Sequence, residues 1–450
     1  VDPTEVENPA ITEDKLFEDA TGGADPLITG LEFAFSDAVN RTAIFTEVVS
    51  DNYVNTSTFI STQLDKPRNI TPNDQYLGDD REIYFKLQTL HSLAEFGLNT
   101  VLPADAEATD FDKAQTLFYK GIAIVILCEN FLAFPLESGG QMIRAEDAIK
   151  DAIETLNEAY QFHSSGDHAI NTKLALARAY RLDKDKLNSV IAANDALALS
   201  GDYIFYAQYD PINLLNRMTI FTVLRSQQDL QPLPRLDFLD PKFASYDGSD
   251  PIPVLKTEEA YLILAEAALS DGDIQGAKSY LQETIVLAAN RLVVPFLDND
   301  SRNGRPNNSA LKVKADSEAQ EISGLIYERS GSLVDTHPVS AISLNIDDID
   351  ALSSSEDLYQ ALFLIRQEIF FSEGRRMSDL GIRLPVMERQ IDTNPNVSNG
   401  DYGTVVFVPD YIPPEDELDE FSLDENTGVV TINYDMNKIL AENKNQTSPF

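Results

Sequence analysis

Apolar residues recur every three or four positions over long stretches of this chain, which is the pattern of helices that bury one face. One long helix is predicted over residues 26–49 and a second over about residues 80–98. The segment between them, 51–80, is rich in Asn, Asp, Thr and Pro and predicts a long ordered loop. The N-terminal part of the chain is therefore expected to be mainly helical.

Further along, the helical pattern occurs in pairs that are separated by short turns. Such helices are predicted over residues 111–133, 146–160, 172–182, 187–199, 257–269 and 274–289. In the last pair Thr257 is the predicted N-cap, and Gly272-Asp273 is the predicted turn. Antiparallel helix pairs with small residues at their crossings are similar to tetratricopeptide repeats, which stack into a curved scaffold. We assign residues 111–200 and 257–290 to such pairs.

The remaining chain has an irregular pattern. Residues 203–253 and 291–357 are interpreted as insertions rich in proline, aromatic and turn-forming residues. The C-terminal region, 395–450, is acidic and contains two β-like stretches, 404–408 and 429–432, which predict a small hairpin or edge sheet. The acidic run between these stretches is typical of a solvated face, and a partner-binding segment is the alternative.

The most informative stretch is 358–384. An apolar stripe predicts a helix that ends before Glu373-Gly374-Arg375-Arg376, and further charged residues follow among apolar ones. Charges rarely enter a protein core alone. We therefore expect this charged cluster to be partly buried, mutually paired and structural in role.

This stretch resembles a hallmark of the SusD/RagB family, Glu-Gly-x-Arg-x-x-Asp-Leu after a helix end with Arg-x-Glu. The matching residues are Glu373, Gly374, Arg376, Asp379 and Leu380, with Arg366 and Glu368 upstream and Arg383 downstream. A second segment is similar to another pattern of that family, through Glu259, Tyr261, Leu262, Ala265, Glu266 and Ala267, with Lys256 in place of the usual Arg. The two patterns also occur in the family's order.

The resemblance implies one mostly α SusD-like domain over residues 1–450, in which four tetratricopeptide-like helical pairs pack against an irregular, loop-rich region with minor β hairpins. It also implies a non-catalytic lipoprotein on the extracellular face of the outer membrane of Bacteroidetes. Its partner would be an outer-membrane β-barrel, either a SusC-like TonB-dependent transporter or an assembly barrel. The export signal and the lipidated cysteine would then precede Val1.

Two functions follow from that resemblance. In the first, the protein captures an extracellular oligomer, a glycan or a peptide, for import through the SusC-like barrel. In the second, it is a structural subunit of a machine that assembles outer-membrane or surface proteins, and it has no nutrient ligand.

Composition excludes some other classes of partner. The chain has 34 Lys and Arg against 74 Asp and Glu, a net charge of −40. Nucleic acids and anionic membranes attract clustered cations, so both are disfavoured as direct partners, and membrane contact is expected through the lipid anchor alone. The single cysteine, Cys128, excludes an intramolecular disulfide and lies in an apolar stretch, where a buried inert thiol is expected.

The sequence contains no nucleophile elbow, P-loop or zinc-protease motif. His163 and His168 are close in sequence but have no third ligand beside them, so no metal site is predicted there. Residues 298–304 have some features of a calcium loop, but their acids are wrongly spaced for an EF-hand and the closing Glu is missing. A solvated loop is preferred there, with Ca²⁺ as the alternative.

The ligand-binding candidates also rest on the resemblance, because glycan-binding members usually hold sugars with exposed aromatic rings and with Asn, Asp and Arg on loops. The candidates are Asn52, Tyr53, Asn55, Tyr76, Tyr209, Arg302, Asn303, Arg305 and Asn307. The chain has no tryptophan, the best stacking surface for a sugar, which weakens this hypothesis. In the alternative interpretation Tyr53 packs at a helix end, and Asn52 and Asn55 close turns.

Overall fold

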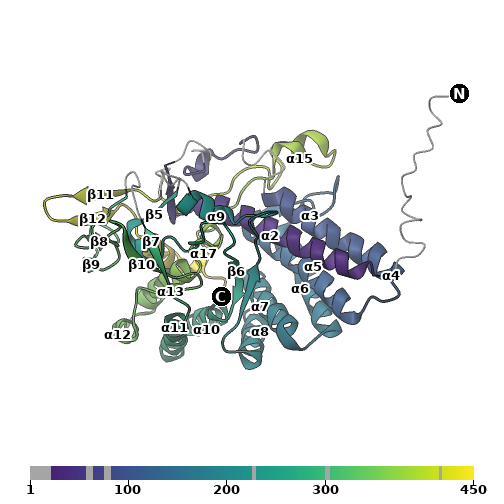
Figure 1. Cartoon of the computed structure of the whole chain (residues 1–450), viewed down its shortest axis with the longest axis horizontal. Coiled ribbons are helices and arrows are strands. Elements are labelled where there is room, and N and C mark those ends of the chain that lie inside the picture. The colour runs from purple at the N-terminus through teal and green to yellow at the C-terminus, as the bar shows by residue number, and fades with distance from the viewer. Residues whose placement is uncertain (1–21, 57–63, 75–82, 225–229, 299–304, 415–417) are drawn as a thin grey trace.

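The structure is a computed structural model that describes residues 22–56, 64–74, 83–224, 230–298, 305–414 and 418–450. Helices form a layer that begins with the long helix α2 (Ala24–Val49) and continues in antiparallel pairs (Figure 1). The helices of this layer are α3 (Ile83–Phe96), α5 (Asp110–Asn130), α6 (Ala145–Phe162), α7 (Gly166–Leu182), α8 (Lys186–Leu199), α10 (Thr257–Ser270) and α11 (Ile274–Ala289). These bounds agree closely with the helices predicted from periodicity, so the mostly α fold is confirmed.

Side-chain caps fix where several of these helices begin. The Thr109 hydroxyl accepts a hydrogen bond from the Asp112 backbone N–H, and the Asp112 carboxylate accepts one from the Thr109 backbone N–H, which forms a capping box at the start of α5. Asp185 and Asp273 cap α8 and α11 in the same general way. Each cap follows a short turn, so the caps set both the length of the turn and the register of the second helix in each pair.

The predicted cap at Thr257 is wrong. The N-cap position of α10 is Lys256, which makes no side-chain capping bond, and Thr257 is the first helical residue. The Thr257 hydroxyl instead accepts a hydrogen bond from the Tyr203 backbone N–H at 2.8 Å. Tyr203 precedes strand β4 (Ile204–Ala207), so this hydroxyl joins the helix to the neighbouring strand pair rather than closing the helix end.

Small sheets and short helical turns connect the long helices and form much of the rest of the described chain. Antiparallel pairs join β1 (Tyr53–Asn55) to β5 (Leu230–Pro232), β2 (Ala133–Phe134) to β3 (Ile143–Arg144), β4 to β6 (Ile252–Lys256), and β7 (Val294–Asp298) to β10 (Ser332–Thr336). The short helical turns are η1 (Pro67–Asn69), η2 (Gly97–Val101), α4 (Leu102–Ala104), α9 (Arg217–Thr219), η3 (Ile220–Leu224), η4 (Pro234–Leu239), α12 (Ile346–Ala351), α14 (Arg376–Asp379), α15 (Glu388–Thr393) and α17 (Lys444–Thr447).

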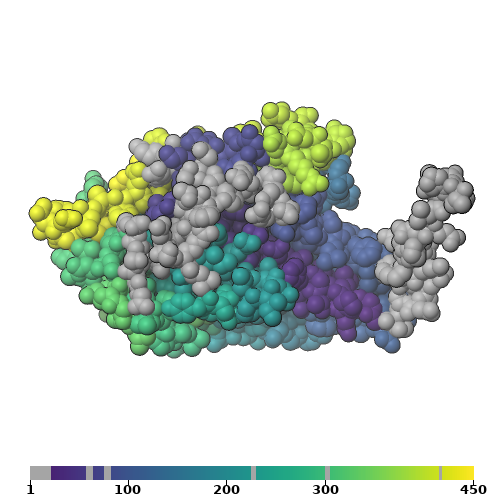
Figure 2. Space-filling model, turned by 45° about the horizontal axis from the view of Figure 1, so that its top comes forward, coloured from purple at the N-terminus to yellow at the C-terminus, as the bar shows by residue number. Residues whose placement is uncertain are grey.

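The predicted C-terminal hairpin exists, but one of its strands was misplaced. Residues 429–432 form β12 (Val429–Ile432), as predicted, but its hairpin partner is β11 (Phe421–Asp424), and β8 (Lys312–Lys314) and β9 (Ile322–Ser323) complete the sheet. Within the described residues, 404–408 make just one bridge, between Phe407 and Arg383. The strand β11 lies at the sheet edge, is largely exposed and sits within the acidic run, so the surrounding acidic residues hid its β character. The hairpin projects from one end of the molecule (Figure 2).

The first long helix, α2, and the last one, α13 (Ser355–Ile369), both lie in the core. Every residue of α2 from 38 to 49 is buried, so this helix runs through the middle of the fold. Helix α13 packs against α10, α11 and α16 (Met436–Glu442). Cys128 is buried within α5, as predicted, and its thiol contacts the Ala145 carbonyl at 3.4 Å. None of the described helices has the length and hydropathy that crossing a bilayer requires.

The turn after α13 approaches α2 so closely that it requires glycine. Gly374 has φ of 76°, and a Cβ there would lie 2.9 Å from the Ala43 Cα. We predict that Gly374→Ala lowers the free energy of unfolding by about 3 kcal/mol, because it adds a steric clash to a left-handed conformation. Urea denaturation measures the loss.

Gly272 provides the matched control, because it has the same φ of 76° in the α10–α11 turn and open space around its missing Cβ. Gly272→Ala should lower the free energy of unfolding by about 1 kcal/mol, because it adds the cost of the left-handed conformation without a steric clash. Equal losses for the two variants would contradict a close approach between α2 and this turn.

Candidate functional site

The charged cluster that follows α13 is buried and paired, as the sequence indicated. Arg366 donates two hydrogen bonds to Asp379, at 2.8 and 3.1 Å, which is the mutual pair expected within the hallmark. Burial alone would raise the pKa of Asp379, but the guanidinium groups of Arg366 and Arg181 hold that pKa below its ordinary value. This pair joins the last residue of α14 to α13.

The other hallmark charges pair with distant parts of the chain. Arg376 donates to both carboxylate oxygens of Asp51, at 2.5 and 2.8 Å, although 325 positions separate the two residues. Glu373 accepts from Lys242 at 2.5 Å and from Lys256 at 2.6 Å. These side chains are at most 3% exposed, so each pair lies in the core.

The two segments that resemble family patterns are side by side in space. Lys256 of the second segment pairs with Glu373 of the first, and Glu259 accepts from Arg375 at 3.0 Å. Glu259 also binds Arg178 of α7 at 2.6 Å. Burial would raise the pKa of Glu259, but Arg178 and Arg375 hold it well below its usual range. One buried network therefore ties the helix pairs to the end of α13.

The remaining hallmark residues also make internal contacts. Leu380 is fully buried, and its carbonyl accepts a hydrogen bond from the Tyr411 hydroxyl at 3.0 Å. Arg383 donates to the backbone carbonyls of Ser378 and Ile382. The hallmark thus stabilises the turn that follows α13.

Most of the described ligand-binding candidates are inside the protein, which corrects the hypothesis of a binding platform on them. Tyr53 is 0% exposed, stacks on Phe371 with ring centroids 4.8 Å apart, and bonds through its hydroxyl to Ser372 at 2.7 Å. The hydroxyl of buried Tyr209 donates to the Ser36 carbonyl at 2.9 Å. Neither ring therefore presents a face to solvent. These two aromatics anchor loops to the core, as in the alternative interpretation of Tyr53.

The polar candidates next to Tyr53 are also buried. Asn52 donates to Glu47 at 2.7 Å, and Asn55 in β1 is 8% exposed. They were misjudged because loop composition predicts exposure, whereas this loop pairs with β5 and is covered by it.

In the second candidate loop, the described residues Arg305 and Asn307 also make contacts within the protein. Arg305 is buried and pairs with Asp237 at 2.5 Å and with Asp240 at 3.0 Å. Asn307 is exposed and accepts a hydrogen bond from the Arg329 backbone N–H. Tyr76, Arg302 and Asn303 lie outside the described residues. Of the loop considered for calcium, Asp298 pairs with Arg329 at 2.7 Å, and residues 299–304 also lie outside them.

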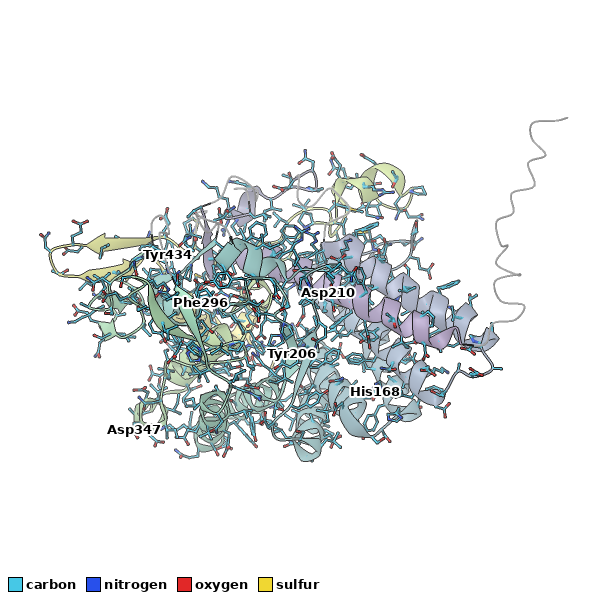
Figure 3. All side chains as sticks on the ribbon, in the orientation of Figure 1. His168, Tyr206, Asp210, Phe296, Asp347 and Tyr434 are labelled. Carbon is cyan, nitrogen blue, oxygen red and sulfur yellow. The ribbon has the colours of Figure 1, made fainter. Side chains whose placement is uncertain are left out.

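His163 and His168 pack as aromatic rings. Their centroids lie 5.8 Å apart, and both rings contact Phe111 (Figure 3 labels His168). In the part of the chain that the structure describes, no group of three or more His, Cys, Asp or Glu side chains is arranged to hold a metal ion.

A cavity lies elsewhere, between α3, α5, α6 and the segment 136–143. It has a volume of about 600 Å³, whereas other pockets in the described residues measure about 200, 190 and 20 Å³. That volume is within the usual range of small-molecule sites, roughly 300–1,000 Å³. Its polar lining includes His91, Glu95, Lys120, Asp151 and Glu154. This acidic pocket is the candidate site.

Sequence reasoning missed the acidic pocket for two reasons. Its lining residues come from separate segments that only the folded helix layer brings together. Acidic residues are also so frequent in this chain that no particular set of them stood out. One usable signal was the run of carboxylates on α6 at helical spacing, Asp151, Glu154 and Glu158, which shares one side of that helix.

Comparison with known proteins places the fold. No protein-family model and no curated protein matches the sequence. Among solved structures, a SusD-like carbohydrate binding protein from Bacteroides vulgatus superposes with a TM-score of 0.53 at 13% identity, over 80% of this chain and 82% of the other. A SusD superfamily protein from Bacteroides thetaiotaomicron gives 0.56 at 13% identity, over 83% and 98%. A SusD-like protein from Bacteroides fragilis gives 0.52 at 11% identity, over 82% and 87%.

These likenesses show that the chain has the SusD-like fold. The fold predicted from the two short sequence patterns is thus confirmed, with its paired helices and its loop-rich half. The superpositions cover 87% and 98% of the lengths of two of these neighbours.

The hallmark residue Glu368 makes the free energy of unfolding depend on pH. Glu368 is buried, and Ser343 bonds to it through its backbone N–H at 2.8 Å and through its hydroxyl. Burial raises the pKa of Glu368 to about 7 from an ordinary 4.5. The folded state therefore keeps this proton up to about pH 7, whereas the unfolded chain loses it near pH 4.5. The stability contributed by this group is complete below about pH 4.5 and is lost as the pH rises through about 7.

We predict that Glu368→Gln removes this loss, because the amide can donate to the Ser343 hydroxyl and accept from its N–H. Between about pH 5 and about pH 8 the unfolding free energy of the variant should gain up to about 3 kcal/mol on the wild type. Glu356→Gln, at an exposed position on the same helix, is the control and should show no such gain. Parallel pH profiles for Glu368→Gln and wild type, measured by urea denaturation, would refute the protonated state of this carboxyl.

Proposed function

We propose that this SusD-like chain is a non-catalytic surface lipoprotein that captures an extracellular oligomer and delivers it to an outer-membrane barrel of the SusC-like, TonB-dependent type. The observation that carries the proposal is the fold, which this chain shares over most of its length with a protein described as SusD-like and carbohydrate binding. Because one fold can host several functions, the cargo has to be argued from the pocket.

The architecture suits a rigid carrier. The helix pairs form a continuous layer, and the buried ion pairs join that layer to the last long helix. A body held in this way can dock on a barrel through its helices and present its other surfaces to cargo. The surface is strongly acidic, so an N-terminal lipid anchor would hold it at the membrane.

A structural role in an outer-membrane assembly machine is the second candidate. It is favoured by the absence of tryptophan and by the burial of Tyr53 and Tyr209, which removes aromatic platforms that a sugar could use. In that role the helix layer would still bind a barrel, and the acidic pocket would face no nutrient.

Affinity capture distinguishes the two. Tagged protein is expressed in its native host, outer membranes are cross-linked and solubilised, and co-purifying proteins are identified by mass spectrometry. We expect one TonB-dependent barrel as the main partner, because the fold has the form of a carrier. Gly272→Ala, predicted to leave the fold almost unchanged, is the control and should keep that partner. Several assembly subunits in place of the transporter would favour the structural role, and the absence of any barrel would contradict both.

A further inference from the structure

A second cavity lies where the end of α5, the start of α6 and the last residue of α7 meet. Its volume is about 200 Å³, and it shares no lining residue with the acidic pocket. Most of its lining is apolar, and the polar side chains that complete it include two arginines, so we call it the arginine pocket. The lining consists of Cys128, Phe131, Leu132, Ala145, Ile149, Leu182, Arg144, Glu146, Arg383 and Tyr402.

Arg383 uses one nitrogen of its guanidinium group for contacts within the protein. Its Nη1 donates to the Ser378 carbonyl at 3.3 Å and to the Ile382 carbonyl at 2.8 Å. Its Nε and Nη2 make no hydrogen bond with the described residues, and protein atoms do not enclose them. Because the N–H groups of Nε and Nη2 lie side by side in the plane of the guanidinium group, they form a free edge with two donors.

The free edge of Arg383 lies on the side of the cavity. Ser378 and Ile382, which accept from Nη1, do not line the arginine pocket, whereas Arg383 itself does and is partly exposed. Its charge also acts on the Cys128 thiol in the same lining. Burial raises the pKa of that thiol, and the positive charge of Arg383 opposes the rise. The accessible donors of Arg383 are therefore available to a molecule in the pocket.

The charge of Arg383 has no ion-pair partner among the described residues. Glu129 and Asp379 act on it from longer range, but Glu129 pairs with Arg375 at 3.0 Å and Asp379 pairs with Arg366 at 2.8 Å. Removal from water therefore dominates, and it lowers the pKa of Arg383 from its ordinary value. A desolvated charge without a partner costs free energy, which a bound anion would offset.

Other arginines of this chain show what such an edge binds. Each of them holds a carboxylate through Nε and Nη2, with one nitrogen on each oxygen. They are Arg178, Arg181, Arg291, Arg366 and Arg376. Arg383 presents the same edge without a carboxylate, in a chain that has 74 acidic residues. The geometry therefore fits a carboxylate that comes from outside the protein.

The other lining residues narrow the choice of anion. Arg144 lies over the Tyr402 ring, 4.7 Å from its centroid, and pairs with Glu146 at 2.7 Å, so its charge is already balanced. The one unbalanced charge of Arg383 matches a carboxylate, whereas a phosphate group brings about two negative charges at pH 7. The apolar walls suit a compact apolar group, because the hydroxyls of a sugar acid would find few hydrogen-bond partners there.

We propose that the arginine pocket binds a carboxylate that carries a compact apolar group, with one carboxylate oxygen on Nε of Arg383 and the other on Nη2. A free short-chain carboxylic acid and the C-terminal residue of a peptide both present this chemistry. Neither the barrel nor the acidic pocket takes part in this site, which goes beyond the proposed capture function.

Calorimetric titration of the full chain with matched probes tests the proposal. Isocaproate represents the free acid, an N-acetylated tripeptide that ends in leucine represents the chain end, and each is compared with its amide. We expect at least one carboxylate to bind about tenfold or more tightly than its amide, because the amide lacks the charge and the second acceptor oxygen. The tighter of the two carboxylates identifies the source.

Equal affinities for both acids and their amides would overturn the proposal. Tighter binding of inorganic phosphate or of glucuronate than of either carboxylate probe would overturn it as well, since the first would replace the carboxylate and the second the apolar group.

Two variants test whether binding occurs at Arg383. Arg383→Lys keeps the positive charge but has no edge with two donors, so it should weaken the bound carboxylate about tenfold. Glu146→Gln removes a negative charge from the exposed part of the lining and frees Arg144, so it should tighten the same probe about threefold. Glu356→Gln is the matched control, because Glu356 is also an exposed acid in the first turn of a helix, and it should leave the affinity unchanged.

Urea denaturation shows whether Arg383→Lys folds, and if it does not, Glu146→Gln and the comparison of acid with amide decide. Affinity that does not rise in Glu146→Gln, or that Arg383→Lys leaves unchanged in a folded protein, would overturn the assignment to this pocket. Absence of the barrel from the affinity capture, with carboxylate binding intact, would contradict the transport role and leave the arginine pocket standing.

Discussion

The burial of charge at the end of α13 is the constraint on which the rest of the fold depends. Glu373, Arg375 and Arg376 lie in the core, and each has its partner on a different part of the chain. A buried ion that loses its partner costs about 3–5 kcal/mol. The helix pairs, α2 and the hallmark turn must therefore assemble together, because each supplies the counter-ions that another requires.

This network also shapes the surface. Many of the 34 cationic residues are placed in the interior, where they neutralise buried carboxylates such as Asp237, Glu258 and Glu266. Fewer cations remain for the exterior of a chain with 74 acids, and the outside becomes more acidic than composition alone suggests. The unpaired carboxylates of the acidic pocket are one result. The placement of arginine and lysine in the interior thus both stabilises the fold and leaves the candidate site acidic.

The helices and the burial of the charged hallmark could be predicted from the sequence. The residues that pair with the hallmark charges could not. Periodicity located α2, α5 and α10–α11, because an amphipathic pattern is a local property. The rule that charges enter a core in pairs predicted a buried cluster, but nothing local to Arg376 names Asp51 as its partner. Tyr53 and Tyr209 were misjudged for the same reason, since tertiary packing buries loop residues that composition makes look exposed. The acidic pocket is created only by the stacking of helices, so the spacing of carboxylates on α6 was its one signal in the sequence.

Pairing across the hallmark holds the fold together, and a double-mutant cycle on Arg376 and Asp51 measures how strongly these two side chains stabilise it. Unfolding free energies of the wild type, Arg376→Ala, Asp51→Ala and the double variant give the coupling energy of the two side chains. The two-bond geometry of this buried pair predicts a favourable coupling of at least about 1.5 kcal/mol, with large losses for each single variant. Additive effects within about 0.5 kcal/mol, or single variants as stable as the wild type but unable to bind a barrel, would contradict the claim and make the hallmark an interaction site.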